Sequence, residues 1–142
     1  MISAINHATL SVRDIDEAFR FYREVLQLKP LAKRKNKSAY FLAGEDWIAL
    51  VQAKGEVSTP SSYAHLAFSV SRKEFDATSA RIKESGATIW QENSSPGESL
   101  YFLDPSGNRL EIHTGSWRSR FQWLKDNPTA EVELFEDGAV NT

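Results

Sequence analysis

Apolar and polar positions follow the same order in two successive stretches of the chain. In the first stretch, residues 5–12 alternate and are rich in β-formers, and residues 14–28 then carry apolar side chains at helical spacing. Turn residues separate three further β-rich runs, at 31–34, 39–43 and 47–52. The pattern predicts a β-α-β-β-β half over residues 1–53.

The same order returns after residues 54–62, whose Gly, Pro and Ser content is typical of a linker. A helix is predicted over 71–85, closed by Gly86. Strands are predicted at 64–70, 87–91, 99–103 and 109–113. This second half spans 63–115, and residues 116–142 follow it as a C-terminal helix and a loosely held tail. The repeat predicts an α+β fold built from two βαβββ halves.

The first strand of each half carries a histidine at the same position, His7 in one and His65 in the other. A pseudo-twofold packing of the halves would bring both imidazoles into one cleft. Glu111 lies on the last strand of the second half, which is expected beside the strand of His65. Two His and one carboxylate form a common ligand set for Mn²⁺, Fe²⁺, Zn²⁺ or Ni²⁺. The counterpart of Glu111 falls near Ile48 or Ala49, neither of which can bind a metal.

A structural role for these residues has to be weighed against the metal site. A single His in an apolar strand is more often a packing residue than a ligand, but two at equivalent places of a repeat favour a ligand pair. Glu111 stands in an otherwise apolar strand, where burial is costly unless the carboxylate is paired or bound to a metal. His113 is expected on the same face as Glu111, and we expect it to support or pack against the site rather than bind the metal.

The amino-acid composition excludes several kinds of site and partner. The chain has no cysteine, which excludes disulfides, thiolate ligands and a cysteine nucleophile together. The net charge is −2 with both signs interspersed, so a nucleic-acid partner is not expected. The chain start lacks the pattern of a signal peptide, and no apolar run is long enough to span a bilayer. We therefore expect a cytoplasmic protein without a membrane partner.

Five segments carry a resemblance to a known family: 5–10, 63–68, 93–99, 101–105 and 109–115. The sequence resembles the vicinal oxygen chelate superfamily and, within it, the FosA-type fosfomycin-resistance thiol transferases. The resemblance extends from residue 5 to about residue 120. It implies a metalloenzyme that opens the epoxide of fosfomycin by adding glutathione, with Mn²⁺ as the usual metal and K⁺ as an activator. Zn²⁺, Ni²⁺ and Fe²⁺ are the alternative metals.

The resemblance also implies roles for particular residues. His7, His65 and Glu111 are the implied metal ligands, and Thr9, Tyr40 and Arg120 are the implied catalytic residues. The implied substrate contacts are Thr9, Trp47, Gln91, Ser95, Tyr101 and Arg120. The implied potassium positions are Asn93, Ser95, Gly97 and Ser99. Gln91 stands where the family pattern has a lysine near the phosphonate, so a neutral amide replaces a cation.

Other functions remain open at this stage. A related hydrolase adds water with a carboxylate base at the position of Ser38, and neither Ser38 nor its neighbours Lys37 and Ala39 supply one. Another branch uses bacillithiol or cysteine as the thiol. A bleomycin-resistance-type protein would bind a small ligand without catalysis, and such binders generally lack the metal ligands. An Fe²⁺ extradiol-type dioxygenase is a more remote alternative that shares the two-His-one-carboxylate set.

The pairing of the halves is expected to occur between subunits. Each half offers an open, curved sheet that cannot close alone, and in this superfamily the pairing commonly joins two chains. We expect a homodimer with two sites, each taking His7 from one chain and His65 and Glu111 from the other. The small-molecule partners are then fosfomycin and glutathione or another low-molecular-weight thiol.

Overall fold

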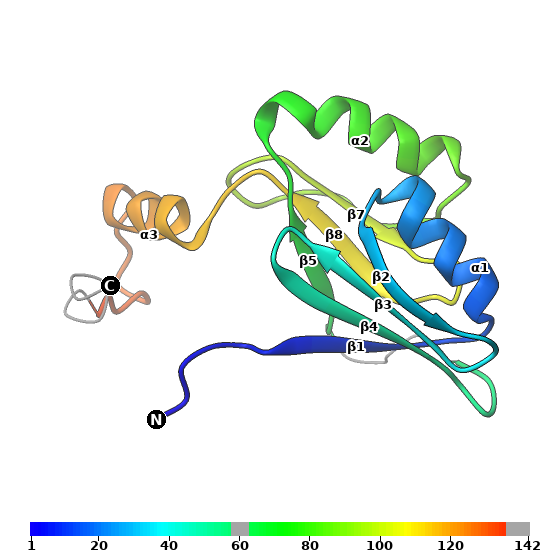
Figure 1. Cartoon of the computed structure of the whole chain (residues 1–142). Coiled ribbons are helices and arrows are strands. Elements are labelled where there is room, and N and C mark those ends of the chain that lie inside the picture. Colours follow the sequence, from blue (N-terminus) through cyan, green and yellow to red (C-terminus); the bar gives the residue numbers. More distant parts are fainter. Residues whose placement is uncertain (58–62, 136–142) are drawn as a thin grey trace.

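The computed structural model of the chain describes residues 1–57 and 63–135, and Figure 1 shows their arrangement. The strands are β1 (His7–Val12), β2 (Lys29–Arg34), β3 (Ser38–Ala43), β4 (Asp46–Gln52), β5 (Leu66–Ser69), β6 (Ile89–Gln91), β7 (Ser99–Leu103) and β8 (Arg109–His113). The helices are α1 (Ile15–Arg20), η1 (Phe21–Val25), α2 (Arg72–Glu84) and α3 (Trp117–Asp126). Part of the predicted linker and part of the predicted tail, residues 58–62 and 136–142, lie outside the described residues.

Two four-stranded sheets have the same topology. The first has the order β1-β4-β3-β2 and the second the order β5-β8-β7-β6. In each, the first strand of the half pairs in parallel with the last, and the other pairs are antiparallel. This symmetry confirms the α+β fold of two βαβββ halves. The exact division at residues 54–62 stays a prediction.

The first helix departs from the single helix predicted over 14–28. The Asp14 side chain caps α1 by accepting the Glu17 amide at 2.9 Å, as a helix N-terminus requires. After Arg20 the backbone widens into the π-helical turn η1, in which the Leu26 amide reaches the Phe21 carbonyl at 3.1 Å. Side-chain periodicity over one turn does not distinguish these two helices.

Local capping residues mark the ends of the later helices. Ser71 accepts the amide of Glu74 at the start of α2, and Gly86 follows its end at φ +83°. A capping box between Ser116 and Ser119 starts α3, in which no residue is buried and which extends away from both sheets in Figure 1. Within residues 1–57 and 63–135, no helix is long and apolar enough to cross a bilayer.

The two halves share one hydrophobic core on the helix side of the sheets. Buried residues of the first sheet and α1 pack together with α2 and the second sheet. The Phe21 and Phe102 rings, one from each half, are 6.4 Å apart between centroids. The fully buried Tyr22 donates its hydroxyl to Asp104 at 2.8 Å, which also joins the halves. Because each sheet buries one face in this core, its alternate residues lie on the opposite face.

Candidate metal and substrate site

The strand register places equivalent residues of the repeat on the outer face of each sheet. In the second sheet Glu111 pairs directly with Tyr101. In the first sheet Ala49 pairs directly with Tyr40. Ala49 is therefore the counterpart of Glu111, which decides between the two positions expected from the sequence. The repeat supplies one carboxylate and not two.

His65 and Glu111, which the sequence predicts to be two ligands of one metal, are in contact. His65 Nε2 lies 2.9 Å from Glu111 Oε1, and the side chains are 22 % and 9 % exposed. Two donor atoms at about 2.1 Å from one ion and at right angles to each other are about 3.0 Å apart. The observed separation fits that spacing. Imidazole and carboxylate are also the donors that Mn²⁺, Fe²⁺ and Zn²⁺ accept, so the residues present fit a divalent metal.

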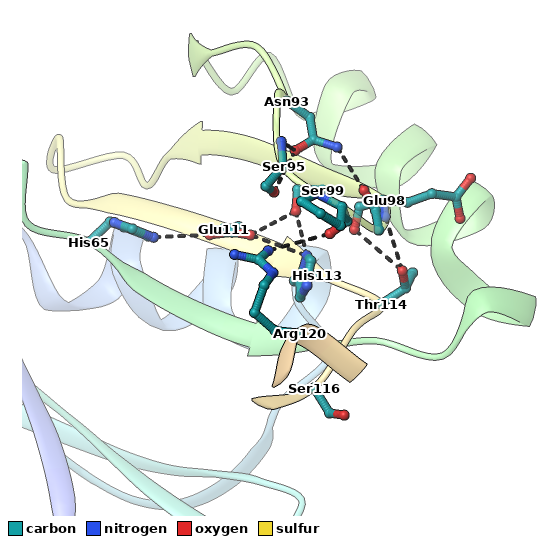
Figure 2. A network of polar contacts seen from close by, with 12 residues as sticks. His65, Asn93, Ser95, Glu98, Ser99, Glu111, His113, Thr114, Ser116 and Arg120 are labelled. Carbon is teal, nitrogen blue, oxygen red and sulfur yellow. Dashed lines mark hydrogen bonds and ion pairs between the residues drawn. The ribbon is translucent and has the colours of Figure 1, made fainter. Parts of the chain in front are cut away.

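The second carboxylate oxygen of Glu111 belongs to a different set of contacts, drawn in Figure 2. Ser99 Oγ lies 2.7 Å from Glu111 Oε2 and 2.6 Å from His113 Nδ1. His113 Nδ1 itself is 3.5 Å from Glu111 Oε2. The buried carboxylate is thus paired on both oxygens, which removes the cost that an isolated buried charge would carry.

Aromatic residues surround His65, and two of them were not identified from the sequence. The ring centroids of Tyr63, Trp90 and Tyr101 lie 5.3, 5.6 and 6.0 Å from that of His65. Gln91 Nε2 donates to the Tyr63 hydroxyl at 2.7 Å. Tyr63 precedes β5 and Trp90 is the middle residue of β6, so periodicity alone could not bring them together. The only signal in the sequence was that they stand close to His65 and Gln91.

His7 lies on the other sheet, with a second aromatic group. Its ring packs on Trp47 at a centroid distance of 4.3 Å, and Tyr40 meets Trp47 edge-on at 5.4 Å. The buried Trp47 Nε1 has no hydrogen-bond partner among the described residues. Thr9 occupies the same outer face of β1, two residues beyond His7.

The predicted three-ligand set does not come together within one chain. Over residues 1–57 and 63–135, no cluster of three or more His, Asp or Glu side chains is placed to hold a metal ion. A cavity of about 1230 Å³ lies between β1 and β5, the strands that begin the two halves. His65 and Glu111 are in contact, whereas His7 lines this cavity and packs on Trp47 of the first sheet.

The predicted potassium loop is organised around Asn93. Its Nδ2 donates to the Gly97 carbonyl at 2.8 Å, and its Oδ1 accepts both the amide and the hydroxyl of Ser95, at 3.1 and 3.0 Å. Arg120 Nη2, from α3, reaches the Pro96 carbonyl at 3.4 Å, so the guanidinium lies beside the loop. The structure gathers these predicted residues, but the hydroxyl of Ser99 is bonded to Glu111 instead.

Comparisons with known proteins agree with this fold. The family model of the glyoxalase/bleomycin resistance protein/dioxygenase superfamily matches residues 4–112. Glutathione transferase FosA of Serratia marcescens is 37 % identical over 142 residues, covering 98 % of this chain and 100 % of the relative. Metallothiol transferase FosB of Shouchella clausii is 38 % identical and covers 96 % and 97 %.

Solved structures extend the similarity to FosX. A FosX variant from Listeria monocytogenes, crystallised with Mn(II) and 1S,2S-dihydroxypropylphosphonic acid, superposes with a TM-score of 0.77 and 28 % identity. The alignment covers 90 % of this chain and 100 % of that one. The chain therefore belongs to the glyoxalase/bleomycin resistance protein/dioxygenase superfamily and lies close, within it, to the fosfomycin-resistance proteins.

Proposed function

We propose that this protein is a metal-dependent thiol transferase that inactivates fosfomycin by adding glutathione to its epoxide. The observation that carries the proposal is the buried His65–Glu111 pair, 2.9 Å apart, in a chain 37 % identical over its length to a glutathione transferase FosA. FosB of Shouchella clausii is a metallothiol transferase and FosX of Listeria monocytogenes was crystallised with Mn(II), which supports a metal in this family.

The metal proposed for this site is Mn²⁺, with Zn²⁺, Ni²⁺ or Fe²⁺ as alternatives, held by His7, His65 and Glu111. When bound, such an ion supplies Lewis-acid stabilisation of the negative charge that develops on oxygen as the epoxide opens. The chain has no cysteine, so the attacking sulfur comes from the cosubstrate. Sulfur bonds to one epoxide carbon as the C–O bond breaks, and the oxygen takes up the proton that the thiol releases.

The side chains around the site bind and orient the substrate. Arg120 brings a positive charge beside the loop, where it offsets the charge of the phosphonate, and the hydroxyl groups of Thr9 and Tyr101 donate hydrogen bonds to it. Trp47 and Tyr40, whose rings meet edge-on, form the apolar wall.

Two features of the second half tune the charge of this site. Asn93, Ser95 and Gly97 present amide, hydroxyl and carbonyl oxygens that suit a hard monovalent cation, which we propose to be K⁺. Gln91 offers only a neutral amide, already bonded to Tyr63, so we expect weaker phosphonate binding than a lysine at this position would give.

A second copy of the chain completes the site in this proposal. Both sheets bury their inner faces in the shared core, and α3 has no buried residue in the single chain. Trp117 and Trp123 of this helix are 52 % and 43 % exposed, which suits an interface. In the homodimer, His7 of one chain joins His65 and Glu111 of the other.

Mixed dimers test this arrangement. One chain carries His7→Ala and the other Glu111→Gln, and heterodimers are purified with two affinity tags. If ligands are shared between chains, one site of each heterodimer is intact and the other has both defects, so about half of the unsubstituted activity is expected. Heterodimers as inactive as the two parent homodimers would place all three ligands in one chain and refute the arrangement.

Hydration of the epoxide is the rival reaction, because FosX is among the similar structures. A water-activating carboxylate is missing from the outer face of the first sheet. The outward positions of β1, β3 and β4 carry His, Thr, Ser, Tyr, Leu, Trp, Ala and Val, and Ser38 stands where the hydrolase pattern has its base. These residues favour addition of a thiol over addition of water.

Product analysis by mass spectrometry distinguishes the candidate functions. Fosfomycin is incubated with the protein, Mn²⁺, K⁺ and one thiol: glutathione, bacillithiol or L-cysteine. We expect a glutathione adduct that requires metal, disappears in Glu111→Gln and persists in Glu84→Gln, an exposed carboxylate of α2. The diol as product would establish a hydrolase, and unchanged fosfomycin with tight binding would establish a binding protein; either refutes the proposal.

A further inference from the structure

We propose that His113 is a positioning residue that orients Glu111 through the hydroxyl of Ser99. The inference rests on the proposed metal site, in which Glu111 is a ligand. His113 Nδ1 is 3.5 Å from Glu111 Oε2, whereas the Ser99 hydroxyl is within 2.7 Å of both atoms, so we infer that His113 acts on this oxygen through Ser99.

Counting protons fixes the direction of the two hydrogen bonds. Ser99 Oγ lies within 2.7 Å of Glu111 Oε2 and 2.6 Å of His113 Nδ1, but a hydroxyl has only one proton to donate. A carboxylate that binds a metal is ionised and can only accept, so the proton of Ser99 points to Glu111. His113 must then donate from Nδ1 to Ser99 Oγ. The chain of donors runs from His113 to Ser99 to Glu111.

Two glycines leave room for the His113 ring in the orientation that this bond requires. A Cβ atom on Gly115 would lie 2.5 Å from His113 Nε2, and one on Gly97 would lie 3.0 Å from Cε1. Gly97 has φ +89°, a conformation that favours glycine in any case, but the contact of Gly115 with the ring is purely steric. The imidazole side chain is 20 % exposed.

The two oxygens of Glu111 therefore have different roles. Oε2 is bonded to Ser99, which leaves Oε1 directed at His65 as the atom available for a metal. Ligating carboxylates are commonly fixed by such outer contacts, and losing one typically costs about 10- to 100-fold in metal affinity. Without the donor at His113, the Ser99 hydroxyl can turn away and the carboxylate is free to rotate.

A matched pair of substitutions tests the role of the Nδ1 donor. The amide of His113→Asn can occupy the place of Nδ1, whereas that of His113→Gln reaches only the place of Nε2. We expect the Mn²⁺ dissociation constant, measured from the electron paramagnetic resonance of free Mn²⁺, to rise about 10- to 100-fold in His113→Gln. His113→Asn should retain most of the affinity. Ser99→Ala should match His113→Gln, and combining the two should add little, because both break one chain of bonds.

Proton-detected ¹⁵N spectra of the unsubstituted protein give a second readout that needs no variant and no activity. They should show a protonated Nδ1 at His113. An unprotonated Nδ1, or Mn²⁺ binding by folded His113→Gln equal to that of the unsubstituted protein, would overturn the positioning role while leaving the metal site in place. Failure of the unsubstituted protein to bind Mn²⁺ would overturn the proposed function and this inference together.

Discussion

Replacing Tyr22 by Phe removes one buried hydroxyl group and little else. Tyr22 is fully buried, and its hydroxyl donates to Asp104 Oδ2 at 2.8 Å across the two halves. Asp104 is 4 % exposed and keeps three other donors in the variant: the amides of Ser106 and Asn108 on Oδ1, both at 2.9 Å, and Asn108 Nδ2 on Oδ2 at 2.8 Å. The substitution therefore removes one of the four hydrogen bonds to the Asp104 carboxylate and leaves the other three.

The expected cost follows from that arrangement. A hydrogen bond to a charged group contributes about 1.5–3 kcal/mol. Because Oδ2 retains the Asn108 donor, we expect Tyr22→Phe to lower the free energy of unfolding by about 2 kcal/mol near pH 8. Tyr40→Phe is the control: this ring is 39 % exposed, so its substitution should change stability by no more than about 0.5 kcal/mol.

The same hydroxyl predicts a pH dependence. Burial, together with the negative charge of Asp104, raises the pKa of Tyr22 well above its usual value of 10.0. The unfolded chain releases the phenolic proton as the pH passes about 10, whereas the folded chain retains it. The stabilising contribution of Tyr22 is therefore complete below pH 10 and is lost above it, at about 1.4 kcal/mol per pH unit. The difference between the two proteins should fall below about 1 kcal/mol at pH 11.

Urea unfolding followed by circular dichroism provides the measurement. All proteins are compared at the same concentration, because unfolding of the proposed dimer would depend on it. A Tyr22→Phe variant as stable as Tyr40→Phe at pH 8 would show that the bond across the halves contributes nothing. A difference that stays constant up to pH 11 would refute the pKa argument.

Three further substitutions test the core, the ring contact and the loop. Phe102→Ala should lower the unfolding free energy by about 3–5 kcal/mol, since Phe102 is fully buried; a midpoint unchanged in calorimetry would contradict the shared core. Gly115→Ala should displace His113 and raise the Mn²⁺ dissociation constant about tenfold, and an unchanged constant would mean that the ring tolerates the added methyl. Asn93→Ala should raise the K⁺ concentration needed for half-maximal activation, measured at constant ionic strength with Na⁺ as the balance; identical K⁺ curves would remove the loop from that role.

Most of the strands could be predicted because the sheets to which they belong bury one face in the core. A short apolar run predicts β7 and alternation of apolar and polar residues predicts β8, and the two strands occupy the predicted ranges 99–103 and 109–113. The π-helical turn could not be predicted, because contacts distant in sequence accompany it. Arg81 Nε donates to the Val25 carbonyl at 2.7 Å at the end of that turn, 56 residues away along the chain.

The site was predictable only as far as the repeat reaches. Equivalent histidines and one carboxylate in an apolar strand pointed to His65 and Glu111, and the register confirms that their strands are neighbours. His113 was expected to support or pack against the site, but its link to Glu111 through Ser99 could not be predicted. Ser99 was assigned to potassium by resemblance, and only the pairing of β7 with β8 shows that it faces His113.

The position of the core explains why, within one chain, His7 is separated from His65 and Glu111. Ile48 and Leu50 of the first sheet and Leu110 and Ile112 of the second enter the same core, so the residues alternating with them face outward from it. His7 stands on one of these outer faces and Glu111 on the other. Turning both faces toward each other within one chain would expose the apolar faces that hold the halves together. A second copy can supply His7 to Glu111 without that cost, and on this ground we favour a site shared between subunits over a rearrangement of the single chain.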